Sequence, residues 1–376
     1  MKFMEGVNKM FDRIGVIGSG SGGRAIAGMV ANKGYKVTLG YRTKRKVATI
    51  KKRKTLEVCG ALEKDVKLES VTNNVQNLVE NSNIILIVVP ANAHDAVIDQ
   101  IAPYLVDGQI VLLNPGRTWG AINAYNRLKQ LRPNLEIFIG ETQTLLYTCR
   151  AIDDRGVHIL KVKDEVDCCF YPESDNILME DIISEMLPTL NIIDDIRQTS
   201  LNNIGSIVHP ATVLLNSGAI SRQQEFLFYS EGMTRAVVNV LEAIDEERCT
   251  VIKRAGLESK SLLQWLGDVY GCYEDNLFDA FRNVSCYADI KAPPKLEMRY
   301  VLEDVPTGLV PLASLGDYYG INTPNIDSII QLASCMFNRD FMNLGRTIDR
   351  IGVPEEILHH HIIPDLASYF TEAMFS

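Results

Sequence analysis

Residues 18–23 read GSGSGG, and they stand between the apolar stretch DRIGVI (12–17) and RAIAGMVANKGYKVTLGYR (24–42). Three of these glycines follow the G-x-G-x-x-G spacing that joins a buried strand to a helix in dinucleotide-binding folds. The first glycine of such a loop permits a tight turn, the second lets the backbone approach a pyrophosphate, and the third lets the helix pack on the strand. The N–H groups at the start of that helix attract phosphate. We therefore predict a nucleotide-binding loop made of Gly18, Ser19, Gly20, Ser21, Gly22 and Gly23.

The residues that end the next predicted strand indicate which nucleotide this loop favours. A carboxylate there would bind the ribose 2′-hydroxyl of NAD(H) and repel the 2′-phosphate of NADP(H). The sequence instead has Gly40, Tyr41 and Arg42 at this place, followed by Lys44 and Arg45. An arginine can hold a phosphate through two parallel hydrogen bonds. The sequence therefore favours NADP(H) and leaves NAD(H) open, and the basic run is also compatible with an ordinary solvated loop.

Strand-like and helix-like segments alternate through the first half of the chain, which is typical of a parallel sheet with helices on both faces. Pro90 ends one of these strands, so we expect it beside the nucleotide. Helices are predicted over 23–34 and 93–105. Apolar strands are predicted over 13–18, 35–42, 83–90, 109–116 and 136–144.

Helical periodicity takes over after about residue 175. It is clearest before Gly256, where Met233, Val237, Leu241 and Ile244 recur at helical spacing. We predict an α/β Rossmann domain with a mostly parallel, doubly wound sheet over 1–195. An all-α domain over 196–376 follows, and we assign it to substrate binding and dimerisation.

Composition and charge exclude several classes of function. The chain has 376 residues, of which 46% are hydrophobic, and a net charge of −9. This charge argues against nucleic acid or an anionic membrane as the main partner. Eight cysteines without a CxxC pair do not form a disulfide or zinc pattern, and the consecutive histidines 359–361 do not share one helix face. The longest apolar run, 84–89, is too short to cross a bilayer. We expect a cytoplasmic protein without a metal.

Two stretches hold candidate residues for proton transfer and for binding a carboxylate. His209 lies in an apolar, helix-like stretch directly before a proline, and such a histidine is either a core residue or a proton-transfer group. Arg299 and Asp304 lie in EMRYVLEDVPTGLVP (297–311), where they are either a surface ion-pair cluster or parts of a site. His94 follows the end of a predicted strand and is a candidate neighbour of the nicotinamide. His158 lies in a strand-like segment, and we expect it to be a structural residue.

Six stretches together resemble the opine dehydrogenases of the octopine/nopaline type. They occur in order along nearly the whole chain, so their combination is specific although each piece is modest. They are GSGSGG (18–23), LLNPGRTWGA (112–121), ETQTLLYTCR (141–150), HPATVLLNSG (209–218), FYSEGMTRAVVNVLEAIDEER (228–248) and RYVLEDVPTGLVPL (299–312).

The resemblance implies an N-terminal Rossmann domain, a C-terminal helical domain and an active site in the cleft between them. It implies that a reduced nicotinamide drives the condensation of an amino acid's amine with a 2-oxo acid, often pyruvate. The histidine before proline, which pairs with the aspartate of the ED-V-P motif, matches His209, and that aspartate matches Asp304. The arginine that assists at the site matches Arg299.

The product of such a reaction carries two carboxylates, so cationic donors are expected near the substrate. Arg299, Arg117 and Arg150 are the candidates, with Thr144 as a neutral donor. Packing between domains is the alternative explanation for Arg117 and Arg150. Tyr229 lies in FYSEG (228–232) and is a weaker candidate for contact with the substrate's side chain.

Two other readings of the chain stay open. One is a reductase related to ketopantoate reductase or glycerol-3-phosphate dehydrogenase, which would rely on a lysine rather than on the pair of His209 and Asp304. The other is a regulator that binds NADP(H) without turnover. The sequence leaves the amino acid, the 2-oxo acid and the oligomeric state undetermined.

Overall fold

The computed structural model describes residues 11–42, 54–153 and 156–359. The chain divides into two compact units, Met1–Asn203 and Ile204–Ser376. The division lies after Asn203 rather than at residue 195, because helix α8 (Ile196–Leu201) is tied to the first unit. Within α8, the hydroxyls of Thr199 and Ser200 donate to Glu141 at 2.7 and 2.6 Å.

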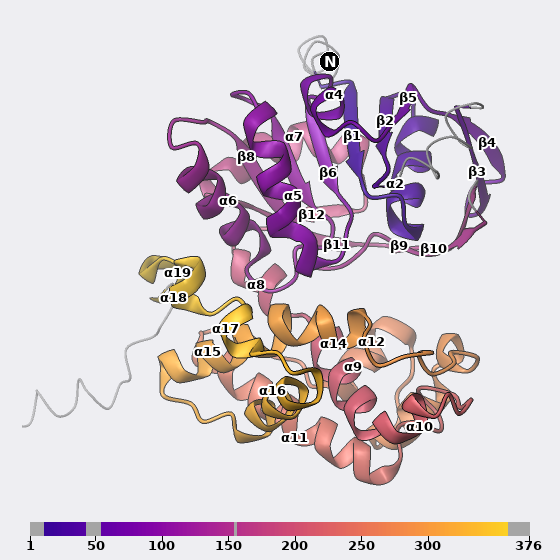
Figure 1. Cartoon of the computed structure of the whole chain (residues 1–376), viewed down its shortest axis with the longest axis vertical. Helices are drawn as coiled ribbons and strands as arrows, with labels where there is room; N and C mark the ends of the chain where they lie inside the picture. The colour runs from indigo at the N-terminus through magenta and orange to yellow at the C-terminus, as the bar shows by residue number, and fades with distance from the viewer. Residues whose placement is uncertain (1–10, 43–53, 154–155, 360–376) are drawn as a thin grey trace, which may run out of the picture. The chain divides into compact units, whose positions relative to one another are not determined.

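The first unit is built on an eight-stranded sheet with the order β12-β11-β8-β7-β6-β1-β2-β5 (Figure 1). Neighbouring strands are parallel except for β8 and β11, which confirms the predicted mostly parallel sheet. Because β1, β6, β7 and β8 are parallel, their carboxyl ends share one edge of the sheet. The strands are β1 (Arg13–Ile17), β2 (Lys36–Gly40), β5 (Ser70–Thr72), β6 (Ile84–Ile87), β7 (Ile110–Leu113), β8 (Phe138–Thr142), β11 (Val166–Tyr171) and β12 (Leu190–Ile192).

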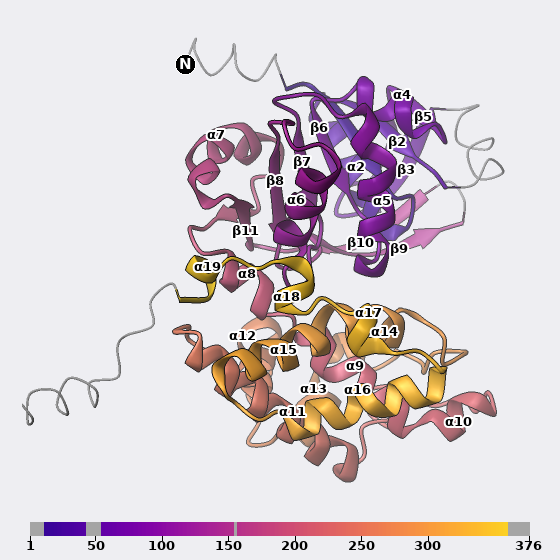
Figure 2. The same ribbon diagram turned by 60° about the vertical axis from the view of Figure 1, so that its left-hand side comes forward.

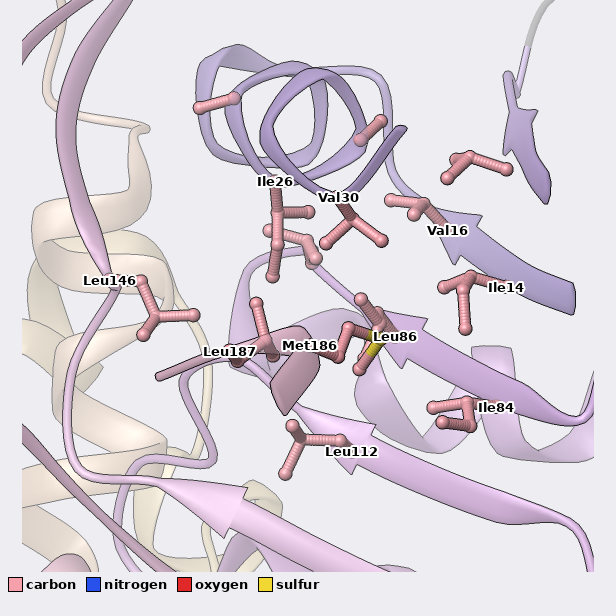
Figure 3. Packing of buried hydrophobic residues seen from close by; sticks show 14 of the residues in the cluster. Ile14, Val16, Ile26, Val30, Ile84, Leu86, Leu112, Leu146, Met186 and Leu187 are labelled. Carbon is pink, nitrogen blue, oxygen red and sulfur yellow. The ribbon is translucent and has the colours of Figure 1, made fainter. Parts of the chain in front are cut away.

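The central strands β6 and β7 are apolar throughout, as expected for a sheet with helices on both faces. All four residues of β6 are buried, as expected for a strand without a solvated face. Figure 3 shows Ile26 and Val30 of α2 packed with Ile14 and Leu86 of the sheet. The helices of this unit, besides α8, are α2 (Ser21–Asn32), α4 (Val75–Glu80), α5 (His94–Ile101), α6 (Gly120–Leu131), α7 (Asn176–Met186) and the short turns η1 (Ala91–Ala93), η2 (Ala102–Tyr104) and η3 (Glu173–Asp175).

A second sheet, which the sequence analysis did not predict as a unit, packs on α2. Its order is β4-β3-β10-β9, and it joins segments about a hundred residues apart. A Cβ on Gly28 would lie 2.6 Å from Val58 Cγ2, so the glycine allows this close approach. The strands are β3 (Thr55–Gly60), β4 (Lys64–Lys67), β9 (Tyr147–Ile152) and β10 (Gly156–Val162).

The described part of the second unit is helical apart from one isolated bridge, which confirms the predicted all-α half (Figure 2). α9 packs against α11, α14, α16 and η5. None of the helices in the described residues combines the length and the hydropathy needed to cross a membrane. The elements are α9 (Ile204–Leu215), α10 (Ser217–Ser221), α11 (Arg235–Arg254), α12 (Leu262–Tyr270), α13 (Leu277–Asn283), η4 (Ser285–Tyr287), α14 (Arg299–Leu302), η5 (Val305–Leu309), α15 (Val310–Tyr319), α16 (Pro324–Phe337), α17 (Phe341–Leu344), α18 (Ile348–Ile351) and α19 (Glu355–His359).

Candidate active site

The glycine loop between β1 and α2 has the shape that a dinucleotide requires. Gly18 adopts φ +126°, and a Cβ there would lie 2.1 Å from Val88 O. A Cβ on Gly23 would lie 1.8 Å from Gly18 O, so the helix starts directly against the turn. Beside Gly20, by contrast, no heavy atom of the described residues lies within 4 Å of a Cβ position. The protein therefore packs tightly against the loop at Gly18 and Gly23 and leaves space at Gly20. Gly20 is the position at which this motif lets a pyrophosphate approach the backbone.

Arg24 holds this loop in place, and the sequence analysis did not identify it. Its side chain is buried, and its guanidinium donates to the carbonyls of Ser19 (3.0 Å), Asp153 (2.8 Å) and Gly156 (3.0 Å). The guanidinium thereby joins the glycine loop to β10 of the second sheet. The signal for this role in the sequence was that Arg24 is a single charged residue on the apolar face of the helix predicted over 23–34.

We predict that Arg24→Met destabilises the first unit by about 2–4 kcal/mol and weakens cofactor binding, because buried carbonyls lose a charged donor. Thermal unfolding and titration with NADPH measure the two effects. Lys36→Met is the matched control, since Lys36 and Asp12 form a partly exposed ion pair at 2.7 Å that contributes about 1 kcal/mol or less. Equal losses in the two variants would contradict the assigned role of Arg24.

The end of β2 presents no carboxylate. A Cβ on Gly40 would meet Leu78 Cδ1 at 2.9 Å, Tyr41 is buried, and Arg42 is exposed. Arg42 thus occupies the place where this fold meets the adenosine ribose. Lys44 and Arg45 lie outside the described residues. Pro90 is exposed just beyond β6, whose neighbouring residue Val88 contacts the glycine loop.

Arg117 and Thr144 follow the carboxyl ends of the neighbouring strands β7 and β8. Arg117 adopts φ +62° and donates from Nη1 to Asn203 Oδ1 at 2.9 Å. Thr144 accepts a hydrogen bond from Lys163 Nζ at 2.8 Å. A Cβ on Gly22 would lie 2.9 Å from Leu145, so the segment after β8 also borders the glycine loop.

The structure separates Arg150 from these two residues. Arg150 lies exposed in β9 of the second sheet, and the next residue's N–H donates to Ser21 Oγ at 2.9 Å. Arg150 is therefore a neighbour of the glycine loop.

The second unit brings His209 and Asp304 together across 95 residues of sequence. Nδ1 of His209 lies 2.7 Å from Asp304 Oδ2, and the two side chains are 14% and 2% exposed. A carboxylate can only accept, so Nδ1 carries the hydrogen and the neutral ring presents a bare Nε2. A histidine held in one tautomer by a buried carboxylate is an arrangement for general acid–base catalysis.

Two irregular helical segments position this pair. His209 lies inside α9 and is followed by Pro210, which has no N–H to continue the helical hydrogen bonds. Asp304 lies directly before η5, a π-helical turn that contains Pro306. Thr307 Oγ1 donates to Glu303 O at 2.8 Å and secures that turn. Such π turns occur frequently at functional sites.

Aromatic rings line the histidine, and this feature was not predicted. The ring of Tyr300 stacks on His209 with centroids 4.1 Å apart and an interplanar angle of 16°. The hydroxyl of Tyr229 lies 3.5 Å from His209 Nε2, at the outer limit of a hydrogen bond. Burial raises the pKa of Tyr229, so the hydroxyl stays neutral. Nε2 of His209 therefore lies near the uncharged hydroxyl of Tyr229, whereas Nδ1 contacts the charged Asp304.

Arg299 is exposed at the start of α14, with its guanidinium 5.5 Å from the Tyr300 ring centroid. Tyr300 itself stacks on His209, so the sequence-predicted residues His209 and Arg299 share one ring, and Asp304 joins them through its contact with His209. The arrangement thus brings a guanidinium and an imidazole to the same aromatic ring.

The other histidines among the described residues, His94, His158 and His359, have contacts of their own elsewhere in the chain. His94 is fully buried in the first unit, with Nε2 3.3 Å from Val89 O, and this burial argues against contact with a nicotinamide. His158 is exposed on β10, and His359 lies 2.7 Å from the Tyr318 hydroxyl. Within the described residues, no group of three His, Cys, Asp or Glu side chains is arranged to hold a metal ion.

Two family models match the chain, one in each half. The model described as the α-helical domain of NAD/NADP octopine/nopaline dehydrogenase matches residues 192–337. The model described as the N-terminus of NAD-dependent glycerol-3-phosphate dehydrogenase matches residues 13–115.

Individual proteins match over almost the whole length. The chain is 32% identical over 339 residues to an opine dehydrogenase of Arthrobacter sp. (strain 1C), covering 90% of this chain and 94% of that one. The structure of octopine dehydrogenase with NADH and L-arginine has a TM-score of 0.76 at 18% identity, with 93% and 98% covered. Yersinopine dehydrogenase with NADP⁺ bound has a TM-score of 0.69 at 17% identity, with 92% and 94% covered. These likenesses confirm the predicted fold class and agree with the resemblance seen in the sequence.

Proposed function

Because the chain belongs to the opine dehydrogenase family and is an NAD(P)-dependent oxidoreductase, we propose that it uses NADPH to condense an amino acid with a 2-oxo acid such as pyruvate. The amine and the oxo group lose water to form an imine, and reduction of the imine leaves a secondary amine. The contact between His209 Nδ1 and Asp304 Oδ2 at 2.7 Å is the observation that carries this proposal.

His209 acts as the general acid and base in this proposal. In the oxidative direction Nε2 accepts the proton of the secondary amine, and in the reductive direction it returns that proton. Asp304 holds the ring in the tautomer that leaves Nε2 bare and stabilises the imidazolium that forms. Tyr300 covers one face of the ring and restrains its orientation.

The glycine loop would hold the cofactor, with the pyrophosphate at Gly20 and the start of α2. NADPH, when bound, supplies the hydride for the imine carbon. The exposed Arg42 and the lack of a carboxylate at the end of β2 favour the 2′-phosphate. Pro90 would border the same cofactor, and the position of Arg150 beside Ser21 favours a cofactor contact for it.

Three residues are proposed to bind the carboxylates of the substrates. Arg299 would hold the carboxylate of the amine substrate, because it shares the Tyr300 ring with His209. Arg117 and Thr144 would receive the 2-oxo acid at the ends of β7 and β8, where ligands of open α/β sheets bind. The side chain of the amino acid stays undetermined.

The proposed reaction is tested by following NADPH absorbance with pyruvate and a panel of L-amino acids, and by identifying the product by mass spectrometry. NADPH oxidation that requires both substrates, with a secondary amine as product, is expected. Oxidation by a 2-oxo acid alone would favour a ketopantoate-reductase type of enzyme. NADPH binding without turnover on any pair would favour a regulator.

Exchange of Arg42 for Asp is predicted to reverse the cofactor preference. The variant loses a charge-assisted contact to the 2′-phosphate and gains a carboxylate that binds a ribose hydroxyl, so kcat/KM with NADPH falls about 10- to 100-fold while NADH gains. The measurement compares kcat/KM for both cofactors. Arg13→Asp makes the same charge change at the amino end of β1 and is the control. An unchanged preference between NADPH and NADH would mean that Arg42 is a solvated surface residue that does not contact the 2′-phosphate.

A further inference from the structure

The side chain of Lys163, which the proposed reaction does not use, extends from the four-stranded sheet to Thr144, after the carboxyl end of β8 in the eight-stranded sheet. It directly follows β10, and its backbone N–H donates to Leu146 O at 3.1 Å. Its ammonium donates to Thr144 Oγ1 at 2.8 Å. Thr144 is fixed in turn, because Thr142 at the end of β8 donates its hydroxyl to Thr144 O at 2.9 Å. These main-chain and side-chain hydrogen bonds together fix the position of the Lys163 side chain.

The charge of this ammonium is poorly compensated by the protein. The structure gives Lys163 no ion pair with the described residues, and its side-chain partner is a neutral hydroxyl. Burial, together with the positive charges of Arg117 and Lys161, lowers the pKa of Lys163 to about 8. A half-buried cation that feels the charges of two other cations is stabilised by an anion that enters beside it.

The place that the Lys163 ammonium reaches, beside Thr144 after β8, indicates which anion this is. In a Rossmann sheet the strand pair β1 and β2 receives the adenosine half of the cofactor, so the ends of β6, β7 and β8 face the other half and the substrate. Thr144 follows β8 and Arg117 follows β7. We infer that Lys163, together with Thr144, binds the carboxylate that the 2-oxo acid brings to the reaction. This inference rests on the proposed function and names its carboxylate subsite.

The charge states of the groups near Lys163 decide how carboxylate binding should depend on pH. Tyr147 and Cys149 of β9 stay uncharged near neutral pH, because burial raises their pKa values to about 12 and about 11. Glu141 of β8 accepts from Ala121 N, Thr199 and Ser200. Asp164 lies 3.6 Å from Lys161.

Lys163 is therefore the group that titrates in this cluster. It is protonated below about pH 8 and loses its charge as the pH rises through that value. Carboxylate binding should weaken on the alkaline side.

Binding of oxamate, an unreactive analogue of a 2-oxo acid, to the complex of the full-length protein with NADPH tests the inference without turnover. For Lys163→Met we expect a Kd for oxamate about 10- to 100-fold higher at pH 7. The Kd for NADPH should be unchanged. Lys163→Arg should bind within a few fold of wild type at pH 7 and should lose the alkaline weakening, since arginine stays charged. Lys67→Met removes an exposed lysine from β4 of the same four-stranded sheet and is the matched control.

Four outcomes decide the matter. The expected pattern, with thermal unfolding of all variants near wild type, supports the subsite even if no substrate pair turns over. Unchanged oxamate binding in Lys163→Met overturns it. Weakened NADPH binding with unchanged oxamate binding assigns the ammonium to a cofactor phosphate and also overturns it. A loss of oxamate binding in the control variant equal to that in Lys163→Met would trace the effect to the general positive charge of the region and overturns it as well.

Discussion

His209→Ala should lower kcat by about 100- to 10,000-fold while the Kd for NADPH stays at the wild-type value. The variant removes the ring whose Nε2 is proposed to move the proton, and the glycine loop lies in the other unit of the chain. Steady-state kinetics in both directions and a fluorescence titration with NADPH measure the two quantities. The loss should appear in kcat and kcat/KM together, as for an interaction made in the transition state.

A control and a second variant make this result specific. His158→Ala removes an exposed histidine and should leave kcat unchanged. His209→Gln keeps a polar side chain beside the buried Asp304, so it separates loss of proton transfer from loss of folding. Both His209 variants should unfold in one cooperative transition. Turnover within threefold of wild type in a folded His209 variant would remove His209 from the mechanism.

Asp304→Asn is expected to lower kcat by about 1,000- to 10,000-fold, because the amide no longer selects the tautomer that leaves Nε2 bare. The corresponding exchange in Ser-His-Asp triads has an effect near the upper end of that range. Since Asp304 acts through His209, the double variant His209→Ala/Asp304→Asn should be no slower than the slower single variant.

The double-variant comparison tests whether Asp304 is a positioning residue. Kinetics of both single variants and the double variant supply the interaction energy, and Asp317→Asn removes an exposed carboxylate on α15 as the control. Additive losses would mean that Asp304 contributes through a route other than His209. A kcat for Asp304→Asn near the wild-type value would contradict the role altogether.

The candidate site could be predicted only in part from the residues themselves. From spacing alone, His209 was either a core histidine or a proton-transfer group, and the resemblance to a family selected the second role. Nothing in the local pattern indicated that Tyr300 stacks on this ring, and a single cation on an apolar helix face was the one signal that Arg24 fastens the glycine loop. Tyr300 and Arg24 both lie in segments that look like ordinary helix, and their contacts, with a ring and with backbone carbonyls, form only in the folded chain.

The sequence by itself determined the Rossmann half, the glycine loop and the absence of a carboxylate after the second strand. These features are local, because turn conformation, helix start and hydrophobic period depend on residues close in the chain. Only the tertiary structure decided that His209 meets Asp304 across 95 residues and that Lys163 reaches Thr144. Such long-range contacts depend on how helices and strands pack against one another. A hydrophobic period predicts which face of an element is buried, but it does not predict which residue of another element that face contacts.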